Sequence, residues 1–436
     1  MSITLQPGAM EAQAPADRPM RLLLVSYWFP PTNAIGAVRT GKFAKYMHEA
    51  GHAIRVIAGP RAAPLSLPLE VPEPAVSRPG GPAPFPPPDR ASAVAPASVS
   101  IETGRSRAKA ALRRHWYALR QIPDKQASWI VPAVAQGGAI LRDFRPDLIL
   151  ASAPPYSGLI AAARQSAASG VPWVAELRDP WFGNSYNDRP AWRDWLDRVM
   201  ERRTLRSAAA LVAVSPVVAR NLGRAYRQPV ATILNGYAPE DLTPPHPPVP
   251  HETLSIVYTG TIYEGHRDPS PLFAAIARLP EASRRRVRVV FYGPSEHQVA
   301  ALAERCGVRG QVVVMPSVGY RDSLAVQAEA DILLLLQRDH PSDEGNLPAK
   351  AFEYLGALRP ILLIGYAKGV LAGMIRARNA GLVANDPDQI AAQLEAWISQ
   401  VAARGIPASP QSARAGLSRV EQFAEYERFL RAHARV

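Results

Sequence analysis

Lys350 and Glu353 are the two residues whose types and spacing most clearly permit chemistry. They stand near the start of a segment with a helical pattern, 348–357, that opens with Pro348, a residue suited to the first turn of a helix. Side chains three residues apart are neighbours on one helix face. An ammonium group there can neutralise a diphosphate, and a carboxylate one turn deeper can accept hydrogen bonds from both hydroxyls of a ribose. A plain surface ion pair is the alternative.

The residues that lead into this helix complete a candidate phosphate site. Backbone amides at 346–349 have no intrahelical partners and lie at the positive end of the helix dipole. Amides in such a position bind anions. We therefore predict that Asn346, Leu347 and Pro348 surround the phosphate groups of a ligand, with Lys350 as the countercharge.

A second loop with similar chemistry follows the strand pattern at 254–258. Gly260 and Thr261 stand at the exit of this strand, and Gly293 follows the next strand in the same way. Arg267 comes just before a predicted helix. A guanidinium near a helix N-terminus is suited to hold a diphosphate. A solvated loop arginine is the alternative.

Two further loops lie in the first half of the chain. Gly36 follows the first strand pattern, and Arg39 lies just beyond it in a predicted helix. Doubly wound folds bind ligands in such loops, between the carboxyl end of a strand and the next helix. Arg178 and Asp179 follow another strand, and a carboxylate beside an arginine can orient or deprotonate a hydroxyl group. The alternatives are an ordinary turn at Gly36 and a local Arg178–Asp179 ion pair.

Alternating strands and helices must position these loops. Short apolar runs predict buried parallel strands, and apolar residues at helical spacing predict the helices between them, so the chain is expected to be an α/β protein with doubly wound sheets. In the first half, strands are predicted at 21–25, 54–57, 147–152, 173–177, 210–214 and 231–234, with helices near 36–50, 158–169 and 192–207. In the second half, strands are predicted at 254–258, 287–292, 311–315, 331–336 and 360–364, with helices near 269–279, 295–305, 320–328, 348–357, 366–379 and 387–402.

The length of 436 residues and two proline-rich stretches indicate a division into two domains. The insertion at 60–104 lacks periodicity, so we expect no packed core there. The predicted divisions are a disordered tail at 1–18, an N-terminal Rossmann-like domain at 19–242, a hinge linker at 243–250, a C-terminal Rossmann-like domain at 251–409, and C-terminal helices at 410–436 that pack back on the N-terminal domain.

The composition excludes several classes of protein. One cysteine, Cys306, excludes an internal disulfide framework and a cysteine-rich zinc site. No segment approaches the ~18 apolar residues of a transmembrane helix, and residues 1–18 lack a signal-peptide pattern, so a cytoplasmic location is expected. The net charge of +13 indicates an anionic partner. Nucleic acid is not expected, because the basic residues are dispersed and no groove-reading motif is present.

The basic stretch 105–120 contains Trp116 and Tyr117 among its arginines. Such a segment can rest on an anionic membrane surface, with the aromatic rings among the headgroups. This predicts peripheral association with the inner face of the cell membrane. A solvated helix face is the alternative.

Together these stretches resemble the family 4 glycosyltransferases, which have the GT-B fold of two facing Rossmann-like domains with a cleft between them. The similarity is closest to members that build bacterial exopolysaccharide, capsule or O-antigen, and it runs from Met20 to about Ala432 without the proline-rich insertion. The stretches that carry it, in the family's order, are Tyr27-Trp-Phe-Pro-Pro31 with Gly36 and Arg39, Leu177-Arg-Asp-Pro-Trp181, the region of Ser215, Asn235-Gly236, and Pro348-Ala-Lys-Ala-Phe-Glu-Tyr-Leu355.

The resemblance implies a retaining, metal-independent glycosyltransferase of hexosyltransferase type that needs no cofactor. The nucleotide-sugar would bind the C-terminal domain and the acceptor the N-terminal domain. Glu353 matches the second glutamate of the family's E-x7-E motif, which binds ribose. The first glutamate, which lies close to the donor sugar in the family, falls on Gly345, so the motif is broken here.

Roles for the candidate residues follow from this resemblance. Asp179 would position the acceptor hydroxyl, while Arg267 and Lys350 would assist departure of the diphosphate. No metal ligands are expected. The predicted donor-binding residues are Gly260, Thr261, Gly293, Asn346, Leu347, Pro348 and Glu353, and the predicted acceptor-side residues are Gly36, Arg39 and Arg178.

The expected acceptor is a polyprenyl-diphosphate-linked glycan at the inner membrane leaflet, in the synthesis of exopolysaccharide or lipopolysaccharide. Two alternatives remain open. A nucleotide-sugar 2-epimerase shares this architecture and would act without an acceptor. A non-catalytic partner subunit could have kept the fold, which the glycine at Gly345 permits.

Overall fold

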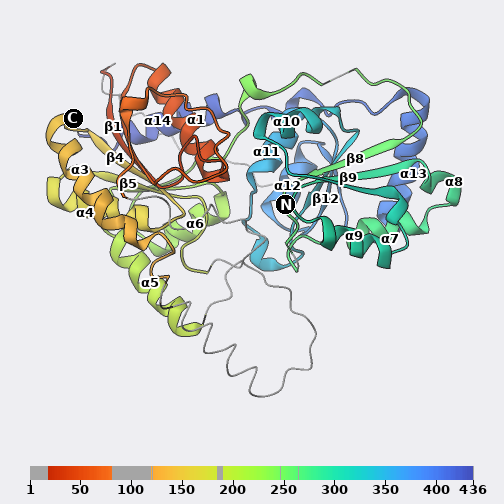
Figure 1. Ribbon diagram of the computed structural model, residues 1–436, viewed down its shortest axis with the longest axis horizontal. Helices are drawn as coiled ribbons and strands as arrows, with labels where there is room; N and C mark the ends of the chain where they lie inside the picture. The colour runs from red at the N-terminus through yellow and green to blue at the C-terminus, as the bar shows by residue number, and fades with distance from the viewer. Residues whose placement is uncertain are drawn as a thin grey trace.

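The computed structural model describes residues 18–80, 119, 121–183, 190–245, 247–263 and 265–435. The predicted tail up to residue 17 and nearly all of the basic stretch 105–120 lie outside these residues. Figure 1 shows two lobes side by side, each built around one sheet with helices packed against it. The chain passes once from the N-terminal lobe to the C-terminal lobe, and its last segment returns to the first lobe.

The N-terminal lobe contains a parallel sheet. Its described strands are β1 (Arg21–Ser26), β2 (Ala53–Ala58), β3 (Val76–Ser77), β4 (Leu148–Ala153), β5 (Trp173–Leu177), β6 (Ala210–Ala213) and β7 (Val230–Thr232). Its helices are α1 (Ile35–Glu49), α3 (Ile130–Phe144), α4 (Ser157–Ser169), α5 (Ala191–Leu205) and α6 (Pro216–Ala225). The strands lie in the order β3-β2-β1-β4-β5-β6-β7.

The C-terminal lobe repeats this plan. Its described strands are β8 (Leu254–Thr259), β9 (Val287–Tyr292), β10 (Val312–Met315), β11 (Ile332–Leu336), β12 (Ile361–Ile364) and β13 (Gly381–Val383), in the order β10-β9-β8-β11-β12-β13. Its helices are α7 (Ser270–Arg278), α8 (Glu281–Arg284), α9 (Glu296–Arg305), α10 (Tyr320–Glu329), α11 (Ala349–Ala357), α12 (Val370–Ala377) and α13 (Pro387–Arg404).

The strand order reverses direction between β1 and β4 in one sheet and between β8 and β11 in the other. This is the order of dinucleotide-binding folds, in which ligands bind beyond the carboxyl ends of the strands at the reversal. The central strands are fully buried because helices cover both faces of each sheet, as in β1, where Leu22 and Val25 are 0% exposed. The predicted α/β class with two doubly wound Rossmann-like domains is confirmed.

The last helix, α14 (Arg419–Arg431), packs against α1 of the N-terminal lobe. It begins with a capping box, in which Ser418 and Glu421 bond to each other's backbone amides. The Phe43 ring lies 5.4 Å from that of Phe423 and 4.9 Å from that of Tyr426. The core of the first lobe therefore contains side chains from the end of the chain.

The expectation of no packed core in the proline-rich insertion is wrong for its described part, residues 60–80. Leu67 and Val71 are only 6% and 5% exposed, and β3 pairs in parallel with β2. The prolines of this segment, Pro60, Pro64, Pro68, Pro72, Pro74 and Pro79, lie outside β3, so none of them interrupts its pairing with β2. Apolar anchors at wide spacing, rather than periodicity, hold this segment on the sheet.

Candidate functional site

Lys350 extends from the first turn of α11 to the loop after β8. Its Nζ atom donates a hydrogen bond to the Thr259 carbonyl at 2.5 Å and lies 4.1 Å from the centre of the Tyr258 ring. Gly260 has a φ of +121°, and a Cβ atom there would lie 2.7 Å from Nζ. Only glycine combines this backbone conformation with such a close approach. The structure thus brings Lys350 and Gly260 together as predicted donor-site residues.

Arg267 supplies a second positive charge near Lys350. Its Nη1 atom donates to the Thr261 carbonyl at 3.0 Å, and its guanidinium lies 4.5 Å from the centre of the Tyr263 ring. Burial, and then the nearby Arg267 charge, hold the pKa of Lys350 well below its ordinary value, although the Glu353 carboxylate acts in the opposite direction. An anionic ligand placed between these cations would stabilise the charged form of Lys350.

Glu353 lies one turn further along α11 and is partly buried. Gln327 donates to its Oε2 atom at 3.5 Å and also to the Thr259 hydroxyl at 3.1 Å. Burial raises the pKa of Glu353, while Arg419, Gln327 and Lys350 counteract this effect. The carboxylate is therefore an acceptor whose ionisation depends on its neighbours.

The loop before α11 is held by Asp343, which is fully buried. Its backbone carbonyl accepts the Asn346 amide at 3.0 Å, and its carboxylate accepts the Asn346 side chain at 3.0 Å. Pro348 is the N-cap residue and has no N–H group. The Asn346 amide is therefore used within the loop, so among the described contacts only the Leu347 and Ala349 amides of the predicted 346–349 stretch remain to donate to a phosphate.

Gly293 and Leu347 occupy the walls around this loop. A Cβ atom on Gly293 would overlap the Gly260 carbonyl, because the loops after β8 and β9 are stacked backbone to backbone. Leu347 is buried, and its carbonyl accepts a hydrogen bond from Asn235 of the N-terminal lobe at 3.4 Å. Both residues shape the site through their backbones, whereas their side chains offer no polar group to a ligand.

The acceptor-side residues cluster at the carboxyl ends of β4 and β5. A Cβ atom on Gly36 would overlap the Arg178 guanidinium, so this glycine lets Arg178 lie against the first turn of α1. The Arg178 Nε atom donates to the Ala153 carbonyl at 3.2 Å. Asp179 follows directly and is partly buried. Gly36, Arg178 and Asp179 therefore share one edge of the first sheet.

Arg39 lies in the wall of the first lobe, behind the acceptor-side residues. Its guanidinium donates to Glu176 Oε1 at 2.8 and 3.0 Å and to the Leu234 carbonyl at 2.7 Å, and the residue is only 3% exposed. Burial would raise the pKa of Glu176, but Arg39 outweighs this effect and holds it below its ordinary value. Arg39 thus fixes the wall beneath the acceptor side of the site.

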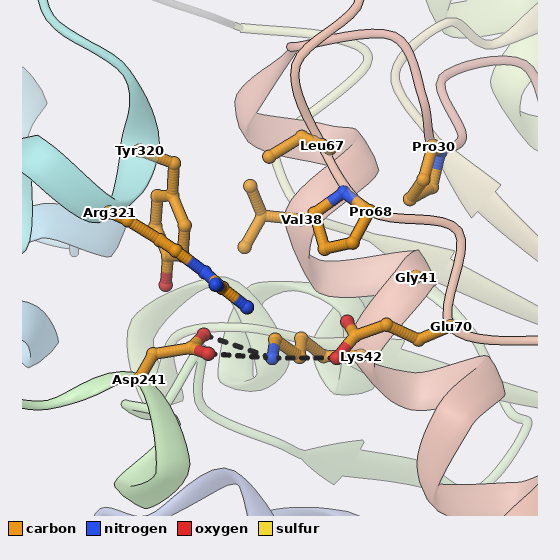
Figure 2. Close-up of a pocket in the computed structure, with 10 residues that line it drawn as sticks. All are labelled: Pro30, Val38, Gly41, Lys42, Leu67, Pro68, Glu70, Asp241, Tyr320 and Arg321. Carbon is orange, nitrogen blue, oxygen red and sulfur yellow. Dashed lines mark hydrogen bonds and ion pairs between the residues drawn. The ribbon is translucent and has the colours of Figure 1, made fainter.

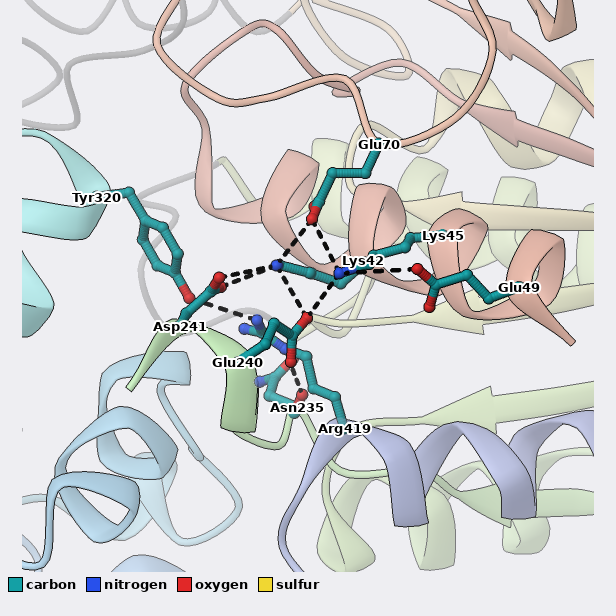
Figure 3. Close-up of polar contacts among 9 residues, drawn as sticks. All are labelled: Lys42, Lys45, Glu49, Glu70, Asn235, Glu240, Asp241, Tyr320 and Arg419. Carbon is teal, nitrogen blue, oxygen red and sulfur yellow. Dashed lines mark hydrogen bonds and ion pairs between the residues drawn. The ribbon is translucent and has the colours of Figure 1, made fainter. Parts of the chain in front are cut away.

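A pocket lies between the lobes, where α1 of the N-terminal lobe faces Tyr320 and Arg321 of the C-terminal lobe (Figure 2). Lys42 of α1 forms part of its floor and is bonded to three carboxylates, those of Glu70 and Glu240 at 3.1 Å and of Asp241 at 2.9 Å (Figure 3). The residues that line the pocket are Pro30, Val38, Gly41, Lys42, Leu67, Pro68, Glu70, Asp241, Tyr320 and Arg321. Sequence reasoning missed Lys42, although a lysine on the buried side of α1 is the kind of signal that marks a buried ion pair.

Arg419 of α14 links the two lobes. It is only 4% exposed, and it donates to the Tyr320 hydroxyl of the C-terminal lobe and to the Asn235 carbonyl, both at 3.4 Å (Figure 3). Its charge is also the first of the groups that oppose the raised pKa of Glu353. Sequence reasoning missed this residue because α14 is far from α10 and α11 along the chain.

Gly345, where the family motif is broken, lies against the N-terminal lobe. A Cβ atom there would lie 2.9 Å from Val217 Cβ and 3.5 Å from the Ser215 hydroxyl, at the start of α6. The Ser215 hydroxyl is buried and has no hydrogen-bond partner among the residues that the structure describes. The glycine therefore allows a close contact between the lobes at the position where the family carries a glutamate.

Within the described ranges, no group of three or more His, Cys, Asp and Glu side chains is placed to hold a metal ion. The helices of that same part of the chain also include none with the length and apolar character needed to cross a membrane.

Comparisons with known proteins agree with this geometry. Residues 36–236 match the model of the glycosyl transferase 4-like domain. No curated protein matches the sequence. Similar solved structures are sucrose-phosphate synthase from Thermosynechococcus elongatus (12% identity, TM-score 0.66, covering 95% of this chain and 98% of that one), HepE from Anabaena in complex with UDP-glucose (14%, 0.59, 95% and 100%), and WaaG, a glycosyltransferase involved in lipopolysaccharide biosynthesis (16%, 0.54, 94% and 98%).

The solved structures share the two-lobed fold over nearly the whole chain, and the domain match covers most of the N-terminal lobe. Residues 36–236 thus match a glycosyl transferase 4-like domain, and the chain is a glycosyltransferase with the GT-B fold.

Proposed function

We propose that the protein is a retaining glycosyltransferase that moves a hexose from a nucleotide-sugar to a lipid-linked glycan in cell-surface polysaccharide synthesis. The observation that carries the donor side is the arrangement of Lys350 and Glu353 on the first turns of α11, opposite the Gly260 loop. WaaG, a glycosyltransferase involved in lipopolysaccharide biosynthesis, and WaaB, a lipopolysaccharide outer core galactosyltransferase, have similar folds, which supports the proposed pathway.

The donor's diphosphate binds at the start of α11. Lys350 and Arg267 neutralise its charge, the free amides of the helix N-terminus donate to its oxygens, and Glu353 accepts the ribose hydroxyls. Fixed positive charge at a leaving group commonly contributes most to such catalysis. These residues supply that charge from the protein itself.

The transfer step exchanges one bond for another at the anomeric carbon. The bond from that carbon to the diphosphate oxygen breaks, and the acceptor oxygen bonds to the same face, which retains the configuration. The acceptor proton passes to the departing phosphate oxygen. Asp179, at the carboxyl end of β5, positions the acceptor hydroxyl. Approach of the two lobes around the donor excludes water and so limits hydrolysis.

A thermal-shift screen of nucleotide-sugars tests the donor side. HepE holds UDP-glucose, so UDP-sugars are the first to screen. A true donor at 100 times its Kd should stabilise the protein by about 2.7 kcal/mol. Glu353→Ala and Lys350→Met should abolish this stabilisation, whereas Arg305→Gln, which removes an exposed cation from the last turn of α9, should keep it. Equal stabilisation of all three variants would reject the assigned site.

An assay without acceptor separates the transferase from a sugar-nucleotide isomerase. The donor is incubated with the enzyme alone and the sugar is analysed for a changed configuration. We expect the donor to remain unchanged, or to hydrolyse slowly, until a lipid-linked glycan is added. Interconversion of free nucleotide-sugars at an enzymatic rate would contradict the proposal.

A further inference from the structure

Two of the three acidic side chains of α5 are turned inward, while Asp194 in the first turn is partly exposed. Asp197 pairs with Arg193 of the preceding turn at 2.9 Å, and both residues are 1% exposed. Glu201 accepts the Tyr226 hydroxyl at 2.7 Å and the Phe182 amide at 2.9 Å. Both of these negative charges are therefore used inside the protein, and neither balances the charges on the outer face of the helix.

The outer face of α5 carries one large aromatic residue and a row of arginines. Trp195 is 66% exposed, an unusual degree for a tryptophan. Arg198, Arg202 and Arg206 are also exposed and follow Trp195 at intervals of three, seven and eleven residues, which places all four side chains on one helical stripe. Arg198 lies 4.1 Å from the centre of the Phe182 ring.

The positive surface continues on the neighbouring helix. Arg220, Arg224 and Arg227 lie on or just after α6 and are exposed, and α6 contains no acidic residue. Tyr226 ties this helix to Glu201 of α5, and Gln228 donates to the last carbonyls of α5 at 3.0 and 3.2 Å. Together with Arg203, these exposed arginines and the stripe on α5 are here called the α5–α6 surface.

We infer that the α5–α6 surface docks the enzyme on a bilayer with anionic phospholipid headgroups. The exposed arginines on the described parts of α5 and α6 outnumber the partly exposed Asp194 and so match a negatively charged surface. An exposed tryptophan on the same stripe suits the headgroup layer, where its ring is apolar and its N–H group meets water. A soluble polyanion would need the charges but would gain nothing from Trp195. No part of the basic stretch 105–120 is needed for this surface.

The position of the α5–α6 surface fits the proposed lipid-linked acceptor, and the biological role of this surface rests on that proposed function. Phe182, which contacts both Arg198 and Glu201, lies three residues after Asp179. Docking through α5 would therefore bring the acceptor side of the first lobe close to the membrane, from which a lipid-linked glycan would enter. The binding test below needs no turnover, so its failure would leave the donor chemistry standing.

Sedimentation of the full chain with vesicles tests the inference. Phosphatidylcholine vesicles are compared with vesicles that also contain phosphatidylglycerol. The wild type should bind the anionic vesicles, and Arg198→Gln/Arg202→Gln should bind them about 30-fold more weakly, from the contribution of two arginines near the surface. The matched control, Arg288→Gln/Arg305→Gln, removes two exposed arginines from the C-terminal lobe and should bind like the wild type.

Trp195→Ala separates a membrane from other polyanions. It should weaken vesicle binding even in high salt, where the arginine contribution is screened, and should leave the thermal unfolding temperature unchanged because the side chain is exposed. The inference is overturned if both double variants bind vesicles equally, or if Trp195→Ala binds like the wild type. Binding of a double-stranded oligonucleotide in preference to vesicles, dependent on Arg198 and Arg202, would also overturn it.

Discussion

Replacing Gly345 tests whether this glycine reflects the loss of a catalytic glutamate or the gain of a close contact between the lobes. If the glycine only marks the loss of the family glutamate, Gly345→Glu should improve donor turnover. In the structure, however, the new Cβ atom would lie 2.9 Å from Val217 Cβ, whereas carbon atoms pack best at about 3.5–4.0 Å. We therefore expect Gly345→Glu to reduce turnover, because the lobes can no longer approach as they do here.

The magnitude follows from the size of the overlap. A single added methyl group in a tightly packed contact costs about 1–3 kcal/mol, which corresponds to a shift of about 5–150-fold in the balance between the observed arrangement of the lobes and a separated one. Gly345→Ala should lower kcat/KM of donor turnover within this range, and Gly345→Glu should lower it further. Small-angle X-ray scattering should show a larger radius of gyration for both variants.

A second substitution tests whether Val217 is the cause. Val217→Gly removes both atoms that a Cβ at Gly345 would meet within 3.0 Å, so Gly345→Ala should cost much less in this background. The reasoning is refuted if Gly345→Glu raises turnover, or if Gly345→Ala costs the same with and without Val217. Because the contact lies between the lobes, the stability of each lobe should be unchanged.

Three further predictions concern ionisation. The pKa of Lys350 is depressed by burial and then by Arg267, so donor binding should be coupled to the uptake of a proton. Donor affinity should then weaken as the pH rises from that depressed pKa toward the ordinary 10.5. Calorimetry in two buffers of different ionisation enthalpy would reveal the proton uptake, which Lys350→Arg should lack. Arg419→Gln should raise the pKa of Glu353 further and move the acidic limb of donor affinity to higher pH, whereas Tyr320→Phe, which changes no charge, should leave that limb in place. Burial alone would raise the pKa of Glu240, but hydrogen bonds from its own amide and from Lys42 lower it from 4.5 to about 2. Above pH 4.5 the wild type should therefore be more stable than Glu240→Gln by at most about 1 kcal/mol, and it should lose this difference as the pH falls toward 2. Urea unfolding measured across that pH range would detect the change.

Strands that are long and apolar could be located from the sequence. The predicted 287–292 is β9 itself, and the predicted 254–258 differs from β8 by one residue. β13 was missed because it is a three-residue edge strand that opens with Gly381, whose Cβ would overlap the backbone of Ile361. Such a short strand contains no apolar run that would reveal it in the sequence. Its first residue is a glycine because the backbone of the neighbouring strand leaves no room for a side chain.

Helix α3 was missed because its sequence contains helix breakers. Pro132 falls in the first turn, where proline is tolerated. Gly137 is required because a Cβ there would overlap Gln165 of α4, which also donates to the Ala133 carbonyl at 2.9 Å. The glycine thus marks a close helix contact, and this can be recognised only when the partner helix is known.

In the candidate site, each loop could be found separately, but the contacts between lobes could not. Lys350 and Glu353 are close in sequence, and their helical spacing was sufficient to place them on one face. Arg419 meets Tyr320 across 99 residues of chain, and Gly345 meets Val217 from the other lobe. No local pattern relates such residues, because their contact depends on how two separately folded sheets are arranged.

The return of α14 to the first lobe has a consequence for the order in which the protein is made. A ribosome completes the N-terminal domain of most proteins first, but here Phe423, Tyr426 and Leu430 belong to the same buried cluster as Leu22 and Met47. The first lobe therefore cannot complete its core during synthesis until the last helix has emerged, whereas the second lobe is contiguous and is finished earlier. The lobe that is translated first is therefore the lobe that completes its folding last. Its apolar surface for α14 stays exposed, and accessible to chaperones, until the end of the chain has been made.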